Sequence, residues 1–196
     1  MQIIVITLPT FIEKESNIIE KLFSLGVDRI HIRKPNASIS KCRELIKEIP
    51  SYYHSKLSLH DNFELTDDFN IGGLHLNQRN PFIPKSFKGI VSRSCHSLKE
   101  IIKYKASVNY LFLSPIFDSI SKKGYMSAFT DENLVLACKQ KIIDDKVYAL
   151  GGISLKNIKQ LPYYGFGGAV LLGDVWEKVD TKSFESYIKQ LITNLI

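Results

Sequence analysis

The sequence predicts an α/β fold, a compact single-domain TIM (β/α)8 barrel with some shortened connections. Eight short apolar runs rich in Ile, Leu and Val recur along the chain, as expected for strands buried on both faces. Stretches with helical spacing alternate with several of these runs, which favours a parallel sheet. The length of 196 residues suits one domain over residues 1–196, at the short end for this fold. An open, doubly wound sheet is the alternative.

The predicted strands are short and follow one another at moderate intervals. In chain order they are Ile3–Ile6, Arg29–Ile32, Leu57–Leu59, Gly73–Leu76, Gly89–Ser92, Tyr110–Leu113, Val147–Leu150 and Ala169–Leu172. Glycine-rich segments flank the last two strands, and these segments favour the barrel over the open sheet.

Local signals place helices between these strands. The apolar residues at positions 18–25 share one helical face, and Gly26 is suited to end that helix. Ser97 precedes the stretch LKEIIKYKA, and Glu100 follows three residues later, which predicts a capping box.

Two more helices and one irregular connection are expected further along. Thr130 precedes the stretch DENLVLACKQK, whose acids at the start and lysines at the end suit the helix dipole. The last helix is predicted to open at Asp180 or Thr181. Residues 77–85 contain two prolines and predict no helix, so this connection is expected to be irregular.

Composition narrows the class of function. The net charge is +6, from 26 Lys and Arg against 20 Asp and Glu, which fits a small anionic substrate. The basic residues are spread along the chain, so nucleic-acid binding is not expected. Cys42, Cys95 and Cys138 form no ligand cluster and predict reduced thiols in a cytoplasmic protein. No run approaches the roughly 20 apolar residues of a membrane span, so a membrane protein is not expected. The sequence does not decide whether the protein forms a homo-oligomer.

Polar residues follow the predicted strands at the end where TIM barrels carry their chemistry. His31 and Arg33 alternate onto one face, and Arg33 suits bidentate binding of an anion. Asp61 can bind a metal, orient a substrate amine or cap the next helix. His75 alternates with leucines and is expected to face the barrel interior, as a structural group more than a catalyst. Ser94 is a candidate substrate contact.

Glycines near the C-terminus predict a phosphate site. Gly151 and Gly152 follow the seventh predicted strand, and Leu172 and Gly173 end the eighth. Glycines at these places let backbone N–H groups approach a phosphate closely, and helix N-termini add a favourable dipole.

The stretch IFDSISKKGY, after the sixth predicted strand, carries hydroxyls and ammonium groups. Ser119 and Ser121 are candidate phosphate donors, and Lys122 is the candidate anion-binding cation. Lys123 has no assigned role, and Gly124 is expected to give the loop its hinge. A solvated loop is the alternative interpretation of this stretch taken alone.

Seven motifs in this order resemble the thiamine phosphate synthase/TenI family over about residues 2–177. They are IHIRKP, LHDN, GGLHLNQRN, SRSCHSLKE, NYLFLSPIFDSISKKG, ALGGIS and GFGGAVLLGDV. The resemblance implies a compact TIM barrel in thiamine biosynthesis. Synthases of the family join hydroxymethylpyrimidine diphosphate to thiazole phosphate, release pyrophosphate and use Mg²⁺.

The resemblance also implies roles for single residues. Arg33 matches the arginine that contacts the diphosphate, and Ser94 matches a serine near it. Asp61 matches a magnesium-binding aspartate, and His60 stands where an asparagine is usual. Lys122 matches the lysine that meets the pyrophosphate.

The thiazole-phosphate half of the site is implied by other matches. Ser119 and Ser121 match the two hydroxyls that hold the thiazole phosphate. Gly152 and the backbone of Leu172 and Gly173 match the cradle of that phosphate, beside Gly151.

Departures from the family pattern leave three hypotheses. Asn80 stands where a second magnesium-binding aspartate is usual, which weakens the expected Asp61–Asn80 metal site. Pro35 replaces a lysine, and His31 replaces a glutamine. The catalytic histidine of the TenI-type tautomerase is replaced by Pro115.

The three hypotheses differ in what the site does. The first is a synthase. The second is a TenI-like thiazole tautomerase in which His31, His60 or His75 transfers the proton. The third is a non-catalytic protein that binds thiazole phosphate.

Overall fold

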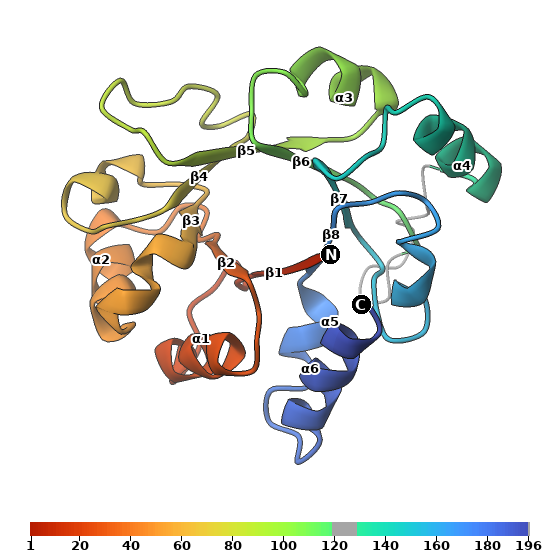
Figure 1. Cartoon of the computed structure of the whole chain (residues 1–196). Coiled ribbons are helices and arrows are strands. Elements are labelled where there is room, and N and C mark those ends of the chain that lie inside the picture. The colour runs from red at the N-terminus through yellow and green to blue at the C-terminus, as the bar shows by residue number, and fades with distance from the viewer. Residues whose placement is uncertain (119–128, 196) are drawn as a thin grey trace.

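The computed structural model is a closed barrel of eight parallel strands in sequential order, with the helices outside it (Figure 1). It describes residues 1–118 and 129–195. The barrel closes where β1 pairs with β8, with Gln2 opposite Gly168 and Val5 opposite Leu171. The predicted barrel is therefore confirmed, and the open sheet is excluded.

All eight predicted strands form, within two or three residues at their ends. They are β1 Gln2–Ile6, β2 Arg29–Ile32, β3 Leu57–Leu59, β4 Gly73–Leu76, β5 Ile90–Cys95, β6 Tyr110–Leu113, β7 Val147–Leu150 and β8 Gly168–Leu171. Strand β5 runs beyond its predicted end, because Ser94 and Cys95 still pair with Phe112 and Leu113 of β6. The extension carries Ser94 on a strand, where its direction is set by the sheet.

The helices lie around the barrel and vary in length. The α-helices are α1 Glu15–Ser24, α2 Ile39–Glu48, α3 Leu98–Tyr104, α4 Asp131–Lys139, α5 Gly173–Trp176 and α6 Phe184–Thr193. Short 3-10 helices are η1 Ser51–Lys56, η2 Phe63–Asp67 and η3 Ile158–Gln160. Residues 77–89, all of them described, contain no helix, so the predicted irregular connection is confirmed.

The helix starts follow the predicted caps in two of three cases. The Ser97 hydroxyl accepts from the Glu100 N–H at 3.2 Å, and the Thr130 hydroxyl accepts from the Asn133 N–H at 3.2 Å. The prediction that α6 opens at Asp180 or Thr181 is wrong. The chain first makes a turn in which the Thr181 hydroxyl donates to the Lys178 carbonyl, so the helix begins only at Phe184.

The core has two layers because the strands alternate. Ile3 and Val5 pack outward against the helices, whereas Ile4 and Ile6 point into the barrel. The apolar part of the interior is aromatic, with Tyr110, Phe112 and Tyr148 packed against Ile4 and Val170. The rest of the interior is polar, and it leads to the mouth of the barrel. None of the described helices has the length and apolar character to cross a bilayer.

Candidate active site

Three histidines meet inside the barrel near its mouth. His31 comes from β2, His75 from β4, and His60 directly follows β3. His31 Nδ1 lies 2.8 Å from His60 Nε2, and His31 Nε2 lies 2.7 Å from the Tyr110 hydroxyl. The rings of His60 and His75 stack with centroids 4.1 Å apart. His75 points inward as predicted, and it lies against His31 and His60 instead of standing alone.

Hydrogen bonds to serines hold the third imidazole. The two ring nitrogens of His75 lie 2.8 Å from the hydroxyls of Ser92 and Ser94. Burial lowers the pKa of His75 to about 3 and holds the pKa values of His31 and His60 well below 6.5. All three imidazoles are therefore neutral at neutral pH, and each keeps one donor and one acceptor nitrogen.

The ligand atoms of these histidines lie within 4.8 Å of one another, a spacing also compatible with a metal ion. The hydrogen bonds to Tyr110, Ser92 and Ser94 use nitrogens that a metal would need. Nearby guanidinium groups of Arg29, Arg33, Arg79 and Arg93 act on the ring charges in the same sense as burial. The cluster is thus a network of neutral hydrogen-bonding groups.

A cavity of about 470 Å³ opens at the C-terminal ends of the strands. It is lined by Ile6, Arg33, His60, Asn77, Gln78, Arg79, Arg93, Ser94, His96, Glu100, Tyr104, Leu150 and Leu172. Of these described residues, three carry guanidinium groups and one carries a carboxylate. A polar cavity with this charge suits a polyanion.

Arg33 and Lys34 are adjacent basic residues with different positions. The Arg33 N–H donates to the Thr7 hydroxyl at 2.9 Å, and the Arg33 side chain lines the cavity as predicted. Lys34 points the other way and is buried, with its ammonium 2.6 and 2.7 Å from the Glu15 carboxylate. Alternation along the chain separates them, because Arg33 lies on the same face as His31 and Lys34 on the other.

Of the two expected metal residues, Asp61 forms an ion pair with Arg79 and accepts a hydrogen bond from Asn80. Asp61 Oδ1 accepts from Arg79 Nε at 3.2 Å, from Arg79 Nη2 at 3.1 Å and from Asn80 Nδ2 at 3.0 Å. Asn80 Nδ2 also donates to the His60 carbonyl at 2.9 Å. The capping alternative for Asp61 does not hold, because Asn62 precedes η2 and makes no side-chain cap there.

The predicted glycines bring two loops together. Gly151 and Gly152 have φ angles of +99° and +66°, and a Cβ on Gly152 would lie 2.3 Å from the Asp118 carbonyl. Phe117 N–H donates to the Gly151 carbonyl at 3.1 Å, so the loop after β7 lies against the start of the loop after β6. These glycines are required by this close approach.

The remaining predicted phosphate contacts are placed only in part. Leu172 lines the cavity, and Gly173 begins the short helix α5. Of the three histidines, His60 lines the cavity, while His31 and His75 lie buried behind it. Ser119, Ser121, Lys122, Lys123 and Gly124, the expected hinge of this loop, lie outside the described residues.

Sequence patterns did not single out Arg79, Arg93 and His96, which also line the cavity. Arg93 alternates away from the serines of β5 and stacks on the Tyr104 ring, 4.0 Å from its centroid. His96 Nδ1 lies 3.2 Å from the Ser114 carbonyl after β6. A signal for Arg79 was present, since a basic residue stands directly beside the missing carboxylate at Asn80.

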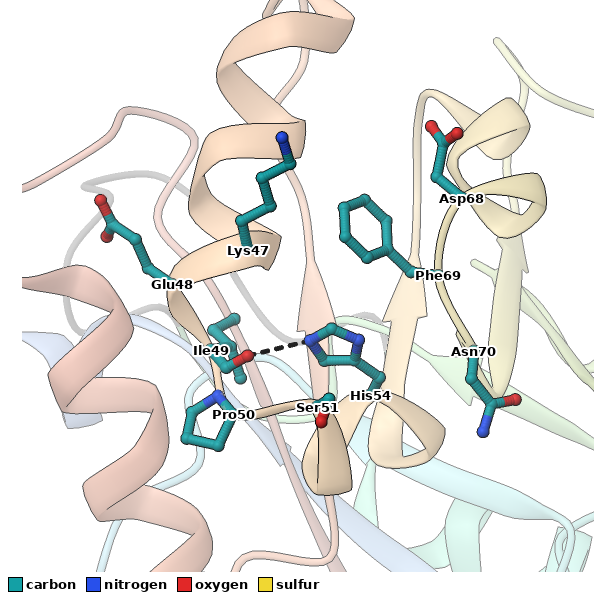
Figure 2. A pocket seen from close by; sticks show the side chains of 9 residues that line it. All are labelled: Lys47, Glu48, Ile49, Pro50, Ser51, His54, Asp68, Phe69 and Asn70. Atoms are coloured by element: carbon teal, nitrogen blue, oxygen red, sulfur yellow. Dashed lines mark hydrogen bonds between the residues drawn. The ribbon is translucent and has the colours of Figure 1, made fainter.

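A second cavity, of about 540 Å³, lies at the opposite end of the barrel (Figure 2). Lys47, near the end of α2, and Asp68 and Asn70, in the segment before β4, contribute to its walls. The His54 imidazole there donates to the Ile49 carbonyl at 2.9 Å and to the Ile46 carbonyl at 3.1 Å. His54 thus provides a hydrogen-bond donor for carbonyl groups at the end of α2. We assign this face of the barrel a structural role.

Comparison with known proteins decides the family. A family model described as thiamine monophosphate synthase matches residues 3–175. The chain belongs to this family. A crystal structure of a thiamine phosphate pyrophosphorylase from Bacteroides thetaiotaomicron is 41% identical, covers 99% of this chain and 97% of that chain, and superposes with a TM-score of 0.90.

More distant relatives agree with the family assignment. A thiamine-phosphate synthase from Thermoplasma acidophilum is 24% identical over 188 residues, covering 92% of this chain and 87% of the relative. A pyrophosphorylase from Pyrococcus furiosus is 18% identical, covers 99% of this chain and 95% of that chain, and has a TM-score of 0.79, which supports the fold. The family resemblance in the sequence motifs is therefore confirmed.

The sequence resemblance predicts Mg²⁺ beside Asp61, so the groups around Asp61 should offer oxygen ligands to the ion. Mg²⁺ takes oxygen ligands in near-octahedral geometry. The Asn80 amide faces two acceptors, the His60 carbonyl and Asp61 Oδ1, so its nitrogen points to the site and its oxygen points away. The Arg79 guanidinium contacts both Asp61 carboxylate oxygens, the atoms that a metal ion would need as ligands. This donor set does not fit Mg²⁺, and use of the ion stays a prediction.

Proposed function

We propose that the chain is a thiamine-phosphate synthase that joins hydroxymethylpyrimidine diphosphate to thiazole phosphate and releases pyrophosphate. The observation that carries the proposal is the cavity at the barrel mouth, where Arg33, Arg79 and Arg93 converge in a chain of this family. Three guanidinium groups match the charge of a diphosphate and offer donors in the planar geometry that phosphate oxygens accept.

The reaction needs the protein to stabilise charge, and it needs no covalent nucleophile from the protein. The bond between the pyrimidine methylene carbon and the diphosphate oxygen breaks, and the diphosphate leaves with the electron pair. The lone pair of the thiazole nitrogen then forms the new C–N bond. Arginines fixed at the mouth stabilise the negative charge that develops on the leaving group. Arg33 is held for this by its backbone bond to Thr7.

The neutral histidine cluster supports the same chemistry. Positive charge develops on the pyrimidine as the diphosphate leaves, and protonated imidazoles below the mouth would oppose it. Burial keeps His31, His60 and His75 uncharged, so the barrel interior adds hydrogen bonds without adding repulsion. The cluster therefore supports binding of a ring that becomes cationic.

The alternatives are less well supported. The matching family model and the relatives are named as synthases. These names do not favour a TenI-like tautomerase or a binding protein without activity. A tautomerase would also need an imidazole that titrates near neutral pH, and the pKa values of the three candidates lie well below that range. The substrates are soluble phosphorylated molecules, and a cytoplasmic location stays a prediction.

The test is direct turnover. The protein is mixed with both substrates, once with Mg²⁺ and once with excess EDTA, and thiamine phosphate and pyrophosphate are quantified. We expect both products in equal amounts and a loss of roughly a hundredfold in kcat/KM for Arg33→Ala. Binding of thiazole phosphate without product under either condition would overturn the proposal.

A further inference from the structure

We propose that Arg79 takes the place of a divalent cation at the barrel mouth, so that this chain holds its diphosphate without Mg²⁺. This rests on the proposed function, because it names the group that meets the charge of the leaving diphosphate. The residues that carry it are Asp61, Asn77, Arg79 and Asn80, which lie together where β3 and β4 end.

The Arg79 guanidinium is held by Asp61. Besides the two bonds to Oδ1, Nη2 lies 3.4 Å from Oδ2, so the guanidinium contacts both carboxylate oxygens. The Asp61 side chain is 15% exposed and the Arg79 side chain 47% exposed. The guanidinium thus engages both oxygens of a largely buried carboxylate, which are the atoms that a metal ion would have to bind.

The loop that carries Arg79 is tied to the barrel. The Asn77 side-chain oxygen accepts from the backbone N–H groups of Arg79 at 2.9 Å and Asn80 at 3.1 Å. The amide nitrogens of Asn77 and Asn80 both donate to the His60 carbonyl at 2.9 Å. These bonds position the Arg79 backbone before any ligand arrives, which lowers the entropy cost of using its side chain.

The local charge is the same as in a site that binds a metal. Two carboxylates and one divalent cation sum to zero, and so do the single Asp61 carboxylate and the Arg79 guanidinium. The loss of the second carboxylate at Asn80 and the presence of a cation at Arg79 therefore compensate each other. Asn80 keeps the position polar without adding a negative charge that would repel a diphosphate.

Arg79 retains donors for a ligand. A guanidinium has five N–H groups, and Asp61 engages those of Nε and Nη2. Nearly half of the side chain is exposed, and it lines the same cavity as Arg33 and Arg93. An incoming diphosphate can therefore contact Arg79 in the planar, bidentate manner that suits phosphate oxygens.

The first experiment measures pyrophosphate binding by calorimetry, without turnover. In excess EDTA we expect wild-type protein to bind pyrophosphate at least as tightly as in excess Mg²⁺. Arg79→Gln should weaken binding in EDTA by roughly tenfold or more, since charge-assisted bonds to phosphate are lost. Arg43→Gln is the matched control, because Arg43 forms an exposed ion pair with Asp68, outside the cavity.

The second experiment restores the usual ligands. In the double variant Arg79→Gln, Asn80→Asp, we expect pyrophosphate binding to recover in Mg²⁺ and to stay weak in EDTA. Binding by the wild type that requires Mg²⁺, or binding unaffected in Arg79→Gln, would overturn the inference. Failure of synthase turnover with Arg79-dependent pyrophosphate binding would instead count against the proposed function and leave this inference standing.

Discussion

At the residue scale, burial decides what the titratable groups of the mouth can do. The three inward histidines are neutral because their surroundings exclude water, while three arginines line the rim. The site therefore has two zones: neutral histidines inside the barrel and arginines at its mouth. A pyrimidine ring and a diphosphate need these two environments.

The buried histidines predict how stability depends on pH. Because the folded pKa of His75 is about 3 and the unfolded value is about 6.5, the unfolded state binds the extra proton as pH falls below 6.5. Stability is therefore fully present above pH 6.5 and is lost on acidification, by up to about 1.4 kcal/mol per pH unit for this group. Urea unfolding between pH 7 and 4.5 measures the slope.

The matched variant is His75→Gln, which keeps a polar side chain between Ser92 and Ser94. Its stability should depend less steeply on pH than that of the wild type. Identical slopes for both proteins would show that His75 is not held neutral.

Gly152 is a residue whose backbone conformation and surroundings exclude a side chain. Its φ angle is +66°, and a side chain has no room there, because its Cβ would lie 2.3 Å from the Asp118 carbonyl. Gly152→Ala should lower the free energy of unfolding by roughly 2 kcal/mol or more. A loss below about 1 kcal/mol in urea unfolding would contradict the role of the close loop contact.

At the element scale, one buried ion pair fastens the loop between β1 and α1 to the end of β2. The Lys34 ammonium donates to the carbonyls of Leu8 at 2.9 Å and Thr10 at 2.8 Å as well as to Glu15. The side chains of Lys34 and Glu15 are 0% and 2% exposed. The loop is thus held beside Arg33 by a charge that water does not reach.

A double-mutant cycle tests this contact. Lys34→Met or Glu15→Gln alone leaves one buried group without its partner and should cost about 3–5 kcal/mol. The double variant should cost less than the sum of the two, because no uncompensated charge remains. Additive losses in urea unfolding would show that the pair is not coupled.

At the scale of the whole molecule, closure of the barrel makes the core one cooperative unit. Phe112 is 0% exposed in the interior and packs with Tyr110, Tyr148 and Val170 from three strands. The single tryptophan, Trp176, donates from its indole N–H to the Ile6 carbonyl at 2.7 Å and so reports on the end of β1.

This arrangement predicts a single unfolding transition. Phe112→Ala should lower the free energy of unfolding by about 3–5 kcal/mol through the cavity it leaves. Tryptophan fluorescence and far-ultraviolet circular dichroism should still change together, as expected for one cooperative domain. Separate transitions would show that the barrel does not unfold as a unit.

Much of the fold was predictable because its signals are local. Buried parallel strands appear as short apolar runs, and all eight were found, as were the caps at Ser97 and Thr130. The start of α6 was missed because the turn at Thr181–Ser183 depends on hydrogen bonds that compete with the helix. The rule that chemistry lies at the C-terminal strand ends also predicts Arg33, His60 and Ser94 at the mouth, where they line the cavity.

The sequence by itself determined the barrel, the family motifs and the set of strand-end residues, since these follow from periodicity and order along the chain. Only the tertiary structure decided which of those residues meet. It joined His31 of β2, His75 of β4 and His60, which follows β3, into one neutral cluster, and it paired Arg79 with Asp61. Such contacts join residues many positions apart, and their distances and burial depend on barrel closure, which no local pattern encodes.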